Sequence, residues 1–303
     1  MKALVIGYGS IGARHARILK EAGFLVTVVS SREVDFSPRV RTVAQALKNT
    51  RFDYAVVANR TADHFGALEE LEEAGHRGVV LVEKPLYLKV QKKQFRFKKV
   101  LVAYNLRFHP LLAELKRRLK NEKIISMFCY VGKYLPNWHP DKDYRLRYSA
   151  IKKYGGGVLR DLSHELDYLM WLGGTWKGVA AVGGHWSHLR ADSDDSFSLL
   201  FSTARCPAVC LQMNYLDRRS RRELIVNTDA HTFRVDLITG EFEIDQDEKR
   251  SFTVGRDDTY RAEHEAVKKK KFEALCSWRE GMETLTLIEA AEKASKNKKW
   301  IFR

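Results

Sequence analysis

The feature that most constrains the fold is a glycine pattern directly after the first apolar segment. Residues 2–6 are apolar enough for a buried strand, and Gly7, Gly9 and Gly12 follow in the spacing G-x-G-x-x-G. Residues 13–22 then place apolar side chains at helical spacing. In such a unit the first glycine allows a tight turn, the second lets a pyrophosphate reach the backbone, and the third lets the helix pack on the strand. The pattern predicts a dinucleotide site at the helix N-terminus.

Apolar segments continue to alternate with helical patterns along the first third of the chain. Strands are predicted at 24–29, 52–58, 79–82 and 100–103, and a helix extends to about residue 74 between the second and third of them. Strands that alternate with helices form a parallel sheet with helices on both faces. We therefore expect an α/β fold in which residues 1–105 form a doubly wound, nucleotide-binding domain and residues 106–303 form a second domain.

The end of the second predicted strand bears on the choice of cofactor. A carboxylate at this position accepts hydrogen bonds from a free ribose 2′-hydroxyl, but the strand ends in Ser30, Ser31 and Arg32. Hydroxyls with a guanidinium suit a 2′-phosphate, so we expect NADP in preference to NAD. Glu33 and Asp35 lie close by and leave NAD open.

The strand at 79–82 ends in Glu83, Lys84 and Pro85. Proline restricts the residue before it and readily accepts a cis bond, so Lys84 is held stiffly at the carboxyl end of a strand. Open α/β sheets bind their ligands at that edge. Lys84 is therefore a candidate site residue, with an ordinary surface lysine as the alternative.

Residues 155–167, GGGVLRDLSHELD, combine a glycine turn with acid/base side chains. Glycines let a backbone approach a ligand closely, and residues three apart on a helix are neighbours. Asp161, His164 and Asp167 would then share one face, where a carboxylate could orient an imidazole. The alternative is a helix start with Asp161 as a capping residue and His164 as a half-buried histidine.

Four motifs together resemble a known family. GYGSIG (7–12), EKP (83–85), YNLRFHP (104–110) and GGGVLRDLSHELD (155–167) occur in the order and spacing of the glucose-fructose oxidoreductase/inositol dehydrogenase (Gfo/Idh/MocA) family, over essentially the whole chain. The resemblance implies an N-terminal Rossmann domain and a C-terminal α/β domain with a large, mostly antiparallel open sheet. It also implies homodimers or homotetramers that form through that sheet.

The resemblance also implies roles for individual residues. Lys84, Asp161 and His164 match the catalytic positions, although the family usually places its histidine four residues after the aspartate, where this chain has Glu165. The following set would contact the cofactor: Gly7, Gly9, Ser10, Ile11, Gly12, Ser30, Ser31, Arg32, Asn59, His64, Glu83, Lys84 and Arg107. We read a one-residue deletion in the turn and keep His164 as the acid/base candidate, a role that moves to Glu165 if that side chain faces the nicotinamide.

The second domain is expected to hold the substrate. Residues 134–148, YLPNWHPDKDYRLRY, mix aromatic and hydrogen-bonding side chains as sugar sites do, or form a loop folded on its own aromatics. The substrate candidates are Tyr104, Asn105, Trp138, Tyr144, Arg145, Asp161 and His164. A helix at 111–120, short strands at 124–132, 179–185, 196–201, 209–215, 223–227, 232–236 and 241–244, and closing helices within 259–295 complete the domain. His185 and His188 lack a third ligand at metal spacing, so no metal site is predicted.

Composition limits the partners and the compartment. The net charge is +15, but the basic stretches at 91–99, 115–123, 218–222 and 268–271 contain no nucleic-acid-binding motif. We expect a solvated basic surface that could attract phosphorylated or carboxylated small molecules, and no nucleic-acid partner. Four scattered cysteines, the lack of signal-peptide features and the lack of a long apolar run predict a cytoplasmic protein without a membrane partner.

These observations predict an NAD(P)-dependent oxidoreductase that acts on a hydroxyl or ketone of a sugar, sugar derivative or cyclitol. The loop at 134–148 also resembles relatives from bacterial surface-polysaccharide pathways. Two alternatives remain open: a cofactor-retaining glycoside hydrolase or internal-redox enzyme, and a non-catalytic sensor of dinucleotide. A hydrolase would regenerate its cofactor, and a sensor would not need Lys84, Asp161 and His164 together.

Overall fold

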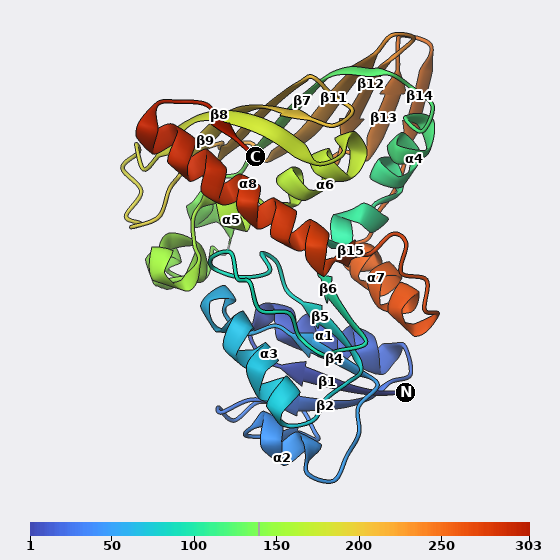
Figure 1. The fold of residues 1–303 in the computed structure, drawn as a ribbon, viewed down its shortest axis with the longest axis vertical. Coiled ribbons are helices and arrows are strands. Elements are labelled where there is room, and N and C mark those ends of the chain that lie inside the picture. Colours follow the sequence, from blue (N-terminus) through green and yellow to red (C-terminus); the bar gives the residue numbers. More distant parts are fainter. Residues whose placement is uncertain (139) are drawn as a thin grey trace. The chain divides into compact units, whose positions relative to one another are not determined.

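The structure, a computed structural model, describes residues 1–138 and 140–303 (Figure 1). Its contacts divide the chain into two compact units, each discontinuous in sequence. The first unit combines Met1–Phe108 with Asp257–Met282, and the second combines His109–Arg256 with Glu283–Arg303. The expected division into 1–105 and 106–303 lies close to the first of these breaks, but it misses the return of residues 257–282 to the first unit.

The first unit is built on a seven-stranded sheet in the order β15-β6-β5-β4-β1-β2-β3. Its strands are β1 (Lys2–Ile6), β2 (Leu25–Val29), β3 (Arg39–Val40), β4 (Tyr54–Val57), β5 (Val79–Val82), β6 (Lys99–Val102) and β15 (Cys276–Ser277). Every neighbouring pair is parallel except β15 with β6. The winding direction reverses between β1 and β4, and ligands of such sheets bind in the crevice at that switch point.

The helices of the first unit follow the predicted alternation. They are α1 (Ser10–Glu21), α2 (Val43–Leu47), α3 (His64–Glu73) and α7 (Asp258–Lys268), with short 3-10 turns η1 (Thr61–Asp63) and η2 (Asn105–Phe108). Helix α1 begins earlier than residue 13, because the glycine turn leads directly into it. Its buried face carries Ala16, Ile18 and Leu19, and also a fully buried His15.

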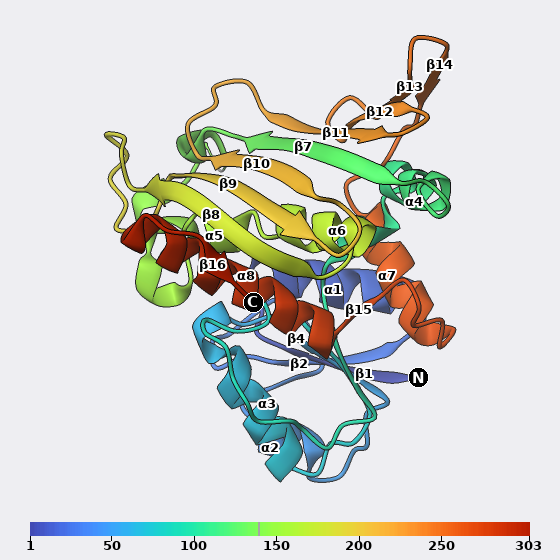
Figure 2. The same cartoon turned by 45° about the horizontal axis from the view of Figure 1, so that its top comes forward.

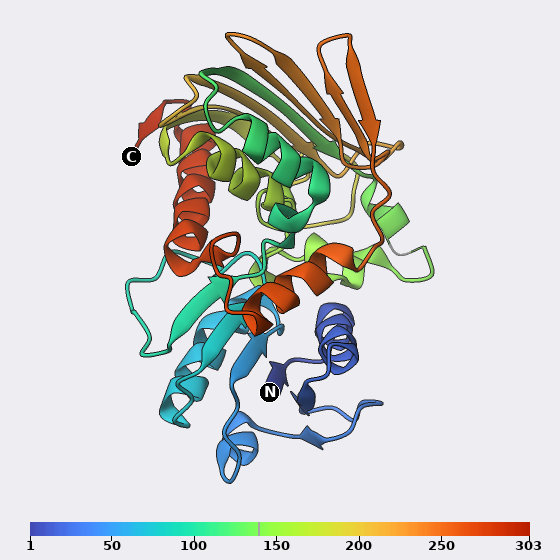
Figure 3. The ribbon, with the colours of Figure 1, turned by 90° about the vertical axis from the view of Figure 1, so that its right-hand side faces the viewer.

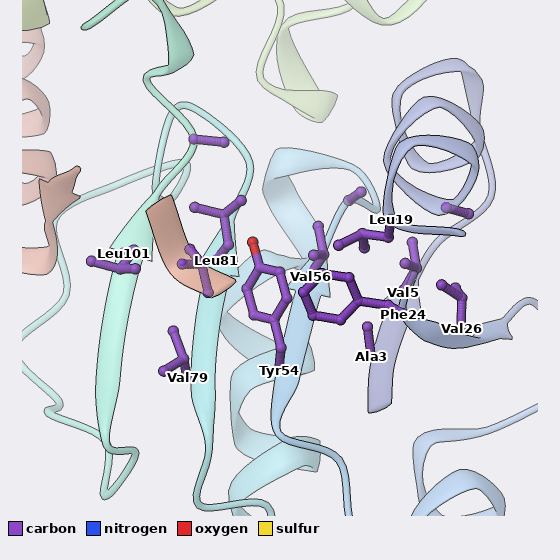
Figure 4. Close-up of a cluster of buried hydrophobic side chains, with 14 of the residues drawn as sticks. Ala3, Val5, Leu19, Phe24, Val26, Tyr54, Val56, Val79, Leu81 and Leu101 are labelled. Atoms are coloured by element: carbon purple, nitrogen blue, oxygen red, sulfur yellow. The ribbon is translucent and has the colours of Figure 1, made fainter. Parts of the chain in front are cut away.

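The core of the first unit lies between its sheet and α1 (Figure 4). Alternate side chains of β1, β4 and β5, such as Val5, Val56 and Leu81, are fully buried there. Tyr54 joins them, and its ring packs on Phe24 with the ring centroids 6.1 Å apart. Each aliphatic side chain of this size contributes about 1.5–3 kcal/mol when it is fully buried.

Residues 257–282 belong to the first unit because their partners are there. Val267 and Leu275 pack in the same core, and β15 extends the sheet beside β6. The Asn105 amide donates to Thr259 Oγ1 over 2.8 Å, and Arg107 pairs with Glu280 at 2.7 Å. In a division at residue 105, the core packing of Val267 and Leu275, the pairing of β15 with β6 and the Asn105–Thr259 bond would all cross between the two domains.

The second unit contains a nine-stranded sheet in the order β14-β13-β12-β11-β7-β10-β9-β8-β16 (Figure 2). Its strands are β7 (Ile124–Gly132), β8 (Trp176–Gly184), β9 (Ser196–Thr203), β10 (Ala208–Asn214), β11 (Arg221–Thr228), β12 (Thr232–Asp236), β13 (Glu241–Ile244), β14 (Glu248–Ser251) and β16 (Ile301–Phe302). Of the neighbouring pairs in this sheet, β7 with β10 is parallel and the others are antiparallel. The predicted α/β fold, with one parallel sheet and one mostly antiparallel open sheet, is confirmed.

Helices cover one face of the second sheet (Figure 3). They include α4 (Pro110–Arg118), α5 (Val158–Asp161), α6 (His164–Gly173) and the part of α8 (Trp278–Asn297) from Glu283 onward. The opposite face carries an apolar row across neighbouring strands, formed by Ala180, Leu200, Cys210, Phe128 and Ile225 in register. Phe128 and Leu200 are about half exposed, at 52% and 44%.

Four short strands, β3, β14, β15 and β16, were not predicted from the sequence. Each has only two to four residues, and β14 reads Glu-Lys-Arg-Ser. An edge strand pairs on one side only and through its backbone, so neither alternation nor hydrophobicity has to mark it.

Two further properties bear on the sequence-based expectations. The four cysteines are free thiols, and Cys210 is the exposed one. Within residues 1–138 and 140–303, no helix has the length and apolar character that crossing a membrane requires.

Candidate functional site

The turn between β1 and α1 has the geometry that its glycine pattern predicts. Gly7 has a φ of +91°, and a Cβ there would lie 2.7 Å from the Asn59 nitrogen at the end of β4. A Cβ on Gly12 would collide with the Gly7 carbonyl oxygen. Both glycines are therefore required by the packing of the turn itself.

Gly9 has no such internal reason to be glycine. Its φ of −84° is open to any residue, and a Cβ there would meet nothing within 4 Å. It is the N-cap residue of α1, where no side chain caps the helix and no acidic residue occupies the first turn. The amides of Ser10, Ile11 and Gly12 thus begin a twelve-residue helix beside open space, as a pyrophosphate group needs. These residues fit a dinucleotide.

The tip of β2 is basic in character. Ser30 is buried, and its hydroxyl donates to the Arg32 carbonyl over 2.9 Å. Glu33 is ion-paired with Arg39 at 2.7 Å, which neutralises the nearest carboxylate. Arg32 is exposed, and among the described residues its guanidinium has no carboxylate partner. Ser31 is exposed beside it.

Lys84 lies at the carboxyl end of β5, in a segment that is held by contacts from His64. The Lys84–Pro85 peptide is cis, and Lys84 is partly buried. His64 is 1% exposed, and its Nδ1 lies 3.2 Å from the Pro85 carbonyl and 3.1 Å from the Leu86 carbonyl. Burial lowers the pKa of His64, so the neutral ring can donate to these carbonyls. His64, expected to contact cofactor, supports the segment after Lys84, and Asn59 lies at the end of β4 and donates to the Asp63 carbonyl over 3.3 Å.

Glu83 is the buried acid next to Lys84. One carboxylate oxygen lies 2.8 Å from His15 Nε2, and the other accepts the Lys84 backbone N–H over 3.0 Å. Burial favours the neutral acid, but the hydrogen bond from His15 and the charge of Lys84 outweigh it and lower the pKa of Glu83. Glu83 is thus a fixed carboxylate at the end of β5.

Three candidates after β6 are buried in the first unit. Tyr104 is 1% exposed, Asn105 is 4% exposed and Arg107 is 3% exposed. Asn105 and Arg107 bind Thr259 and Glu280 as described above. Burial raises the pKa of Glu280, but the charge of Arg107 and the hydrogen bonds from Ser277 outweigh it and lower the pKa overall. These contacts give Asn105 and Arg107 a role in attaching residues 257–282, in addition to any role toward a ligand.

The second glycine turn differs from its sequence-based interpretation. A Cβ on Gly156 would collide with the Tyr148 carbonyl, and one on Gly157 would collide with the Asp194 carboxylate. Gly157 also has a φ of +111°. The close approach that these glycines permit is therefore to the chain itself, and the expectation of a ligand there is wrong for Gly156 and Gly157.

The helix after this turn is broken. Helix α5 ends at Asp161 and α6 begins at His164, with Ser163 between them as the N-cap of α6. Asp161 and His164 are partly exposed, whereas Asp167 is 2% exposed. The single continuous helix expected for the three side chains is thus not present, because the break separates Asp161 on α5 from His164 and Asp167 on α6.

Asp161 is held by a residue that the sequence did not mark. Tyr215, just after β10, donates its hydroxyl to Asp161 Oδ2 over 2.8 Å. Asp194 instead of Asp161 caps α5, accepting the Leu159 N–H over 3.2 Å, so the capping role considered for Asp161 is wrong. Trp138 packs edge-on against Tyr215 with a centroid distance of 5.3 Å. Asp161, Tyr215 and Trp138 therefore form one connected cluster.

Glu165 is directed into the second unit. It is fully buried, and its Oε1 lies 2.7 Å from Arg222 Nε on β11. The Tyr168 hydroxyl lies 3.5 Å from the same carboxylate. This ion pair explains Glu165 as an interior residue and leaves the partly exposed His164 as the acid/base candidate of the segment.

The aromatic loop contributes unequally to this cluster. Trp138 contacts Tyr215, and its indole N–H donates to the Lys133 carbonyl over 3.2 Å. The Tyr144 hydroxyl accepts the Arg190 N–H over 3.1 Å, and Arg145 forms a two-pronged pair with Asp143. Residue 139 of this loop lies outside the described residues. The structure brings Trp138 to Asp161, and gives Tyr144 and Arg145 partners within the loop region.

The two histidines that flank Trp186 have separate surroundings. His185 lies 3.3 Å from Asp195 and 3.2 Å from the Ser193 carbonyl, while His188 is exposed. Among residues 1–138 and 140–303, no group of three or more histidine, cysteine or acidic side chains has the geometry of a metal site.

Comparisons with known proteins show which solved structures have a similar fold. No family model and no curated protein matches the sequence. Among solved structures, a levoglucosan dehydrogenase with NADH and levoglucosan is 15% identical with a TM-score of 0.85, covering 100% of this chain and 99% of its own. GenD2 from gentamicin A biosynthesis, with NAD, is 18% identical (TM-score 0.81, 100% and 96% covered). The WlbA dehydrogenase of Bordetella pertussis, with NADH and UDP-GlcNAcA, is 16% identical (TM-score 0.77, 100% and 98% covered). At these identities, what the chain shares with these proteins is their fold over its whole length.

Proposed function

We propose that this protein is an NAD(P)-dependent oxidoreductase of the Gfo/Idh/MocA type that acts on a sugar, sugar derivative or cyclitol. The observation that carries the proposal is Gly9, which borders open space at the N-terminus of α1 although neither packing nor backbone geometry requires glycine there. The full-length likeness to dehydrogenases crystallised with NAD or NADH supports the same cofactor class.

The proposed catalytic residues are Lys84, Asp161 and His164. When bound, the cofactor accepts or donates hydride at nicotinamide C4. The protein must then hold the substrate hydroxyl and move its proton. His164 is partly exposed and suits proton transfer near neutral pH, Lys84 stabilises the developing alkoxide, and Asp161 accepts a substrate hydroxyl while Tyr215 fixes its orientation.

The remaining site residues have three proposed roles: binding the cofactor, binding the substrate and supporting the segments that do so. Backbone amides of the first glycine turn bind the pyrophosphate, and Ser31 and Arg32 bind the adenosine ribose. Trp138 provides an apolar face for a sugar ring beside Asp161. Glu83, Asn59, His64 and Arg107 act by supporting the segments that carry Lys84 and the cofactor contacts. Tyr104, Asn105, Tyr144 and Arg145 remain substrate candidates. Tyr104 is buried, and the other three form hydrogen bonds within their own units.

For the cofactor, we propose NADP in preference to NAD. Arg32 has no carboxylate partner among the described residues, and Glu33 is neutralised by Arg39. A guanidinium–phosphate contact contributes about 1.5–3 kcal/mol, or roughly 10- to 100-fold in affinity. Arg32→Ala should weaken NADPH binding by that factor and leave NADH binding unchanged, measured by cofactor fluorescence. Arg51→Ala, an exposed arginine before β4, is the charge-matched control, and tighter binding of NADH by the unmodified protein would refute the preference.

The activity is tested by screening nicotinamide reduction across sugars, sugar phosphates and nucleotide sugars. Lys84→Ala should abolish hydride transfer while cofactor binding persists, and Lys89→Ala, an exposed lysine five residues on, should behave as the unmodified protein. Full turnover by Lys84→Ala would defeat the assignment. Release of an aglycone without net cofactor reduction would indicate the hydrolase, and cofactor binding without any turnover would indicate the sensor.

We also propose that the bare face of the second sheet pairs with a second copy of the chain, as a homodimer or within a homotetramer. The apolar row through Leu200, Cys210 and Phe128 exposes large side chains that a monomer would leave in water. Phe128→Glu should shift the mass measured by light scattering toward the monomer. Leu25→Glu, an exposed leucine of the first unit, should not, and a monomeric unmodified protein would refute the pairing.

A further inference from the structure

A chain of four buried polar side chains runs through the interior of the first unit and ends beside Lys84. Tyr54 on β4, His264 on α7, His15 on α1 and Glu83 after β5 are its members. The Tyr54 hydroxyl lies 3.0 Å from His264 Nδ1, His264 Nε2 lies 2.8 Å from His15 Nδ1, and His15 Nε2 lies 2.8 Å from Glu83 Oε1. Four separate elements thus converge on one line of hydrogen bonds.

This hydrogen-bond chain is buried away from water. Tyr54, His264 and His15 are each 0% exposed, and Glu83 is 9% exposed. Figure 4 shows the Tyr54 ring among apolar side chains of the core, with its hydroxyl at the edge of the cluster. The ring of Tyr260 closes over His15 at a centroid distance of 5.4 Å, and the Arg14 guanidinium lies 5.1 Å from the Tyr260 centroid. Each polar atom in this interior must therefore be satisfied by its neighbours in the chain.

Counting hydrogens gives the chain one direction. Tyr54 has one hydrogen, and His264 Nδ1 is the acceptor within reach of it. The neutral His264 ring then carries its proton on Nε2 and donates to His15 Nδ1, which leaves His15 Nε2–H to donate to the Glu83 carboxylate. In the reverse direction His15 would carry two protons, and the buried Tyr54 hydrogen would have no acceptor among the residues that the structure describes, at the full desolvation cost of that group.

The charges around the chain agree with this direction. Burial places the pKa of His264 well below its usual value, so its ring is neutral. Burial raises the pKa of Tyr54 well above its usual value, with Glu263 and Glu83 adding to the effect, so the hydroxyl keeps its proton. The one charge in the chain is then the Glu83 carboxylate, which Lys84 helps to compensate.

We propose that Tyr54, His264 and His15 are positioning residues for Lys84: they form a buried donor chain of fixed direction that orients the Glu83 carboxylate. The second oxygen of Glu83 accepts the Lys84 backbone N–H over 3.0 Å, so the orientation of the carboxylate sets the path of the backbone at residue 84. The catalytic consequence rests on the role proposed for Lys84, whereas the direction of the chain does not. His264 also gives residues 257–282 a reason to belong to the first unit.

The direction is tested by nitrogen NMR of the full-length protein labelled with 15N-histidine. The resonances of His15 and His264 are assigned by their loss in His15→Asn and His264→Asn. At neutral pH we expect both rings to be neutral, protonated on Nε2 and bare on Nδ1, and we expect the His264 Nδ1 resonance to lose its hydrogen-bond shift in Tyr54→Phe. A doubly protonated His15, or either ring protonated on Nδ1, would overturn the proposal whether or not the protein turns over substrate.

The link to Lys84 is tested by kinetics. Glu83→Gln places an amide donor against either His15 Nε2–H or the Lys84 N–H, so we expect the rate of hydride transfer to fall roughly 10- to 100-fold, because small displacements of a reacting group have effects of this size. The dissociation constant of the reduced cofactor should stay within about twofold. A Glu83→Gln variant that keeps full kcat, or that loses kcat only in proportion to cofactor binding, would contradict the link.

A matched pair of tyrosines separates positioning from loss of stability. Tyr54→Phe and Tyr168→Phe each remove one buried hydroxyl, since Tyr168 is 0% exposed and its hydroxyl lies 3.1 Å from Cys129 Sγ in the second unit. We expect both variants to lower the unfolding midpoint similarly, but only Tyr54→Phe to lower kcat. Equal kcat values in the two variants would show that the Tyr54 hydroxyl is structural only. If Lys84→Ala is fully active while the histidine tautomers are as expected, the proposed function fails and the hydrogen-bond chain stands.

Discussion

The two glycine turns of this protein look alike in sequence and differ in what occupies the space beside them. In the first turn, Gly7 and Gly12 are packed against their own backbone, but a side chain on Gly9 would meet nothing within 4 Å. In the second turn, side chains on Gly156 and Gly157 would collide with the chain itself. The first turn therefore leaves open space beside Gly9, whereas the glycines of the second turn allow the chain to pack closely on itself.

The two units also hold their buried carboxylates differently. Glu83 in the first unit is held by hydrogen bonds, from His15 and from the Lys84 N–H. Glu165 in the second unit faces a cation, Arg222, at 2.7 Å. A carboxylate held by directional donors is fixed in orientation, whereas one paired with a buried guanidinium mainly contributes to holding its elements together. From this difference we expect Glu83 to act in the proposed site and Glu165 in the scaffold.

The largest expected effect comes from filling the second turn. Gly157→Ala would strain a backbone at φ +111° and ψ +152° and push a methyl group into Asp194, so the free energy of unfolding should fall by about 3–5 kcal/mol. Urea unfolding measures it. Gly66→Ala in α3, where a Cβ has open space, should instead stabilise by up to about 1 kcal/mol. A neutral Gly157→Ala would remove the distinction between the two turns.

The next effect separates Glu165 from His164. Glu165→Gln leaves Arg222 without its charge partner and should lower the free energy of unfolding by about 2–3 kcal/mol, while kcat stays near that of the unmodified protein. His164→Asn should do the opposite, with a large fall in kcat and little change in stability, because His164 is partly exposed. The reverse pattern would move the acid/base role to Glu165.

Acid should weaken the first unit before the second. Burial lowers the pKa of His64, His76 and His264 in the first unit, whereas in the second unit it lowers that of His109, to about 4. Below the unfolded pKa of 6.5, the unfolded chain takes up protons that these rings refuse. Stability present above that pH is therefore lost as the pH falls, by up to about 1.4 kcal/mol per pH unit for each histidine.

Hydrogen exchange followed by peptide mass analysis measures this difference. Between pH 6.5 and 5, amides of β1, β4 and β5 should lose more protection than those of β7, β9 and β10, after correction for the intrinsic exchange rate. Earlier loss in the second sheet would contradict the assignment of neutral buried histidines to the first unit.

The smallest effect on stability is expected at the first turn. Gly9→Ala should cost less than about 1 kcal/mol of unfolding free energy, since its φ of −84° and its surroundings accept a side chain. Its methyl group would occupy the space left for the pyrophosphate, so cofactor affinity should fall about tenfold or more, or about 1.4 kcal/mol, by calorimetric titration. Unchanged affinity would show that the open space is not the cofactor site.

Features set by neighbouring residues could be predicted from the sequence, and features set by distant ones could not. The strand, glycine turn and helix of residues 2–21 are local, and so is the alternation that led to the doubly wound sheet. The position of Lys84 after a buried strand was also local. By contrast, two contacts join distant parts of the sequence. Tyr215 and Asp161 are separated by 54 positions, and His264 and His15 by 249.

The errors have the same origin. The spacing of Asp161, His164 and Asp167 predicts one helical face, but the break at Ser163 depends on how α5 and α6 pack. The run Gly155, Gly156 and Gly157 predicts room for a ligand, but the space beside Gly156 is taken by Tyr148 and the space beside Gly157 by Asp194. A run of glycines indicates that another group lies close to the backbone, but it does not show whether that group is a ligand or another part of the protein.

The most direct test of the proposed activity follows the hydride itself. The protein is incubated with oxidised cofactor and a panel of perdeuterated sugars, sugar phosphates and nucleotide sugars, and the mass of the recovered cofactor is measured. We predict reduced cofactor that carries one deuterium from the sugar carbon, formed by the unmodified protein and absent with Lys84→Ala. Cofactor recovered unreduced and without deuterium across the panel, although it binds, would contradict an oxidoreductase that transfers hydride between sugar and nicotinamide.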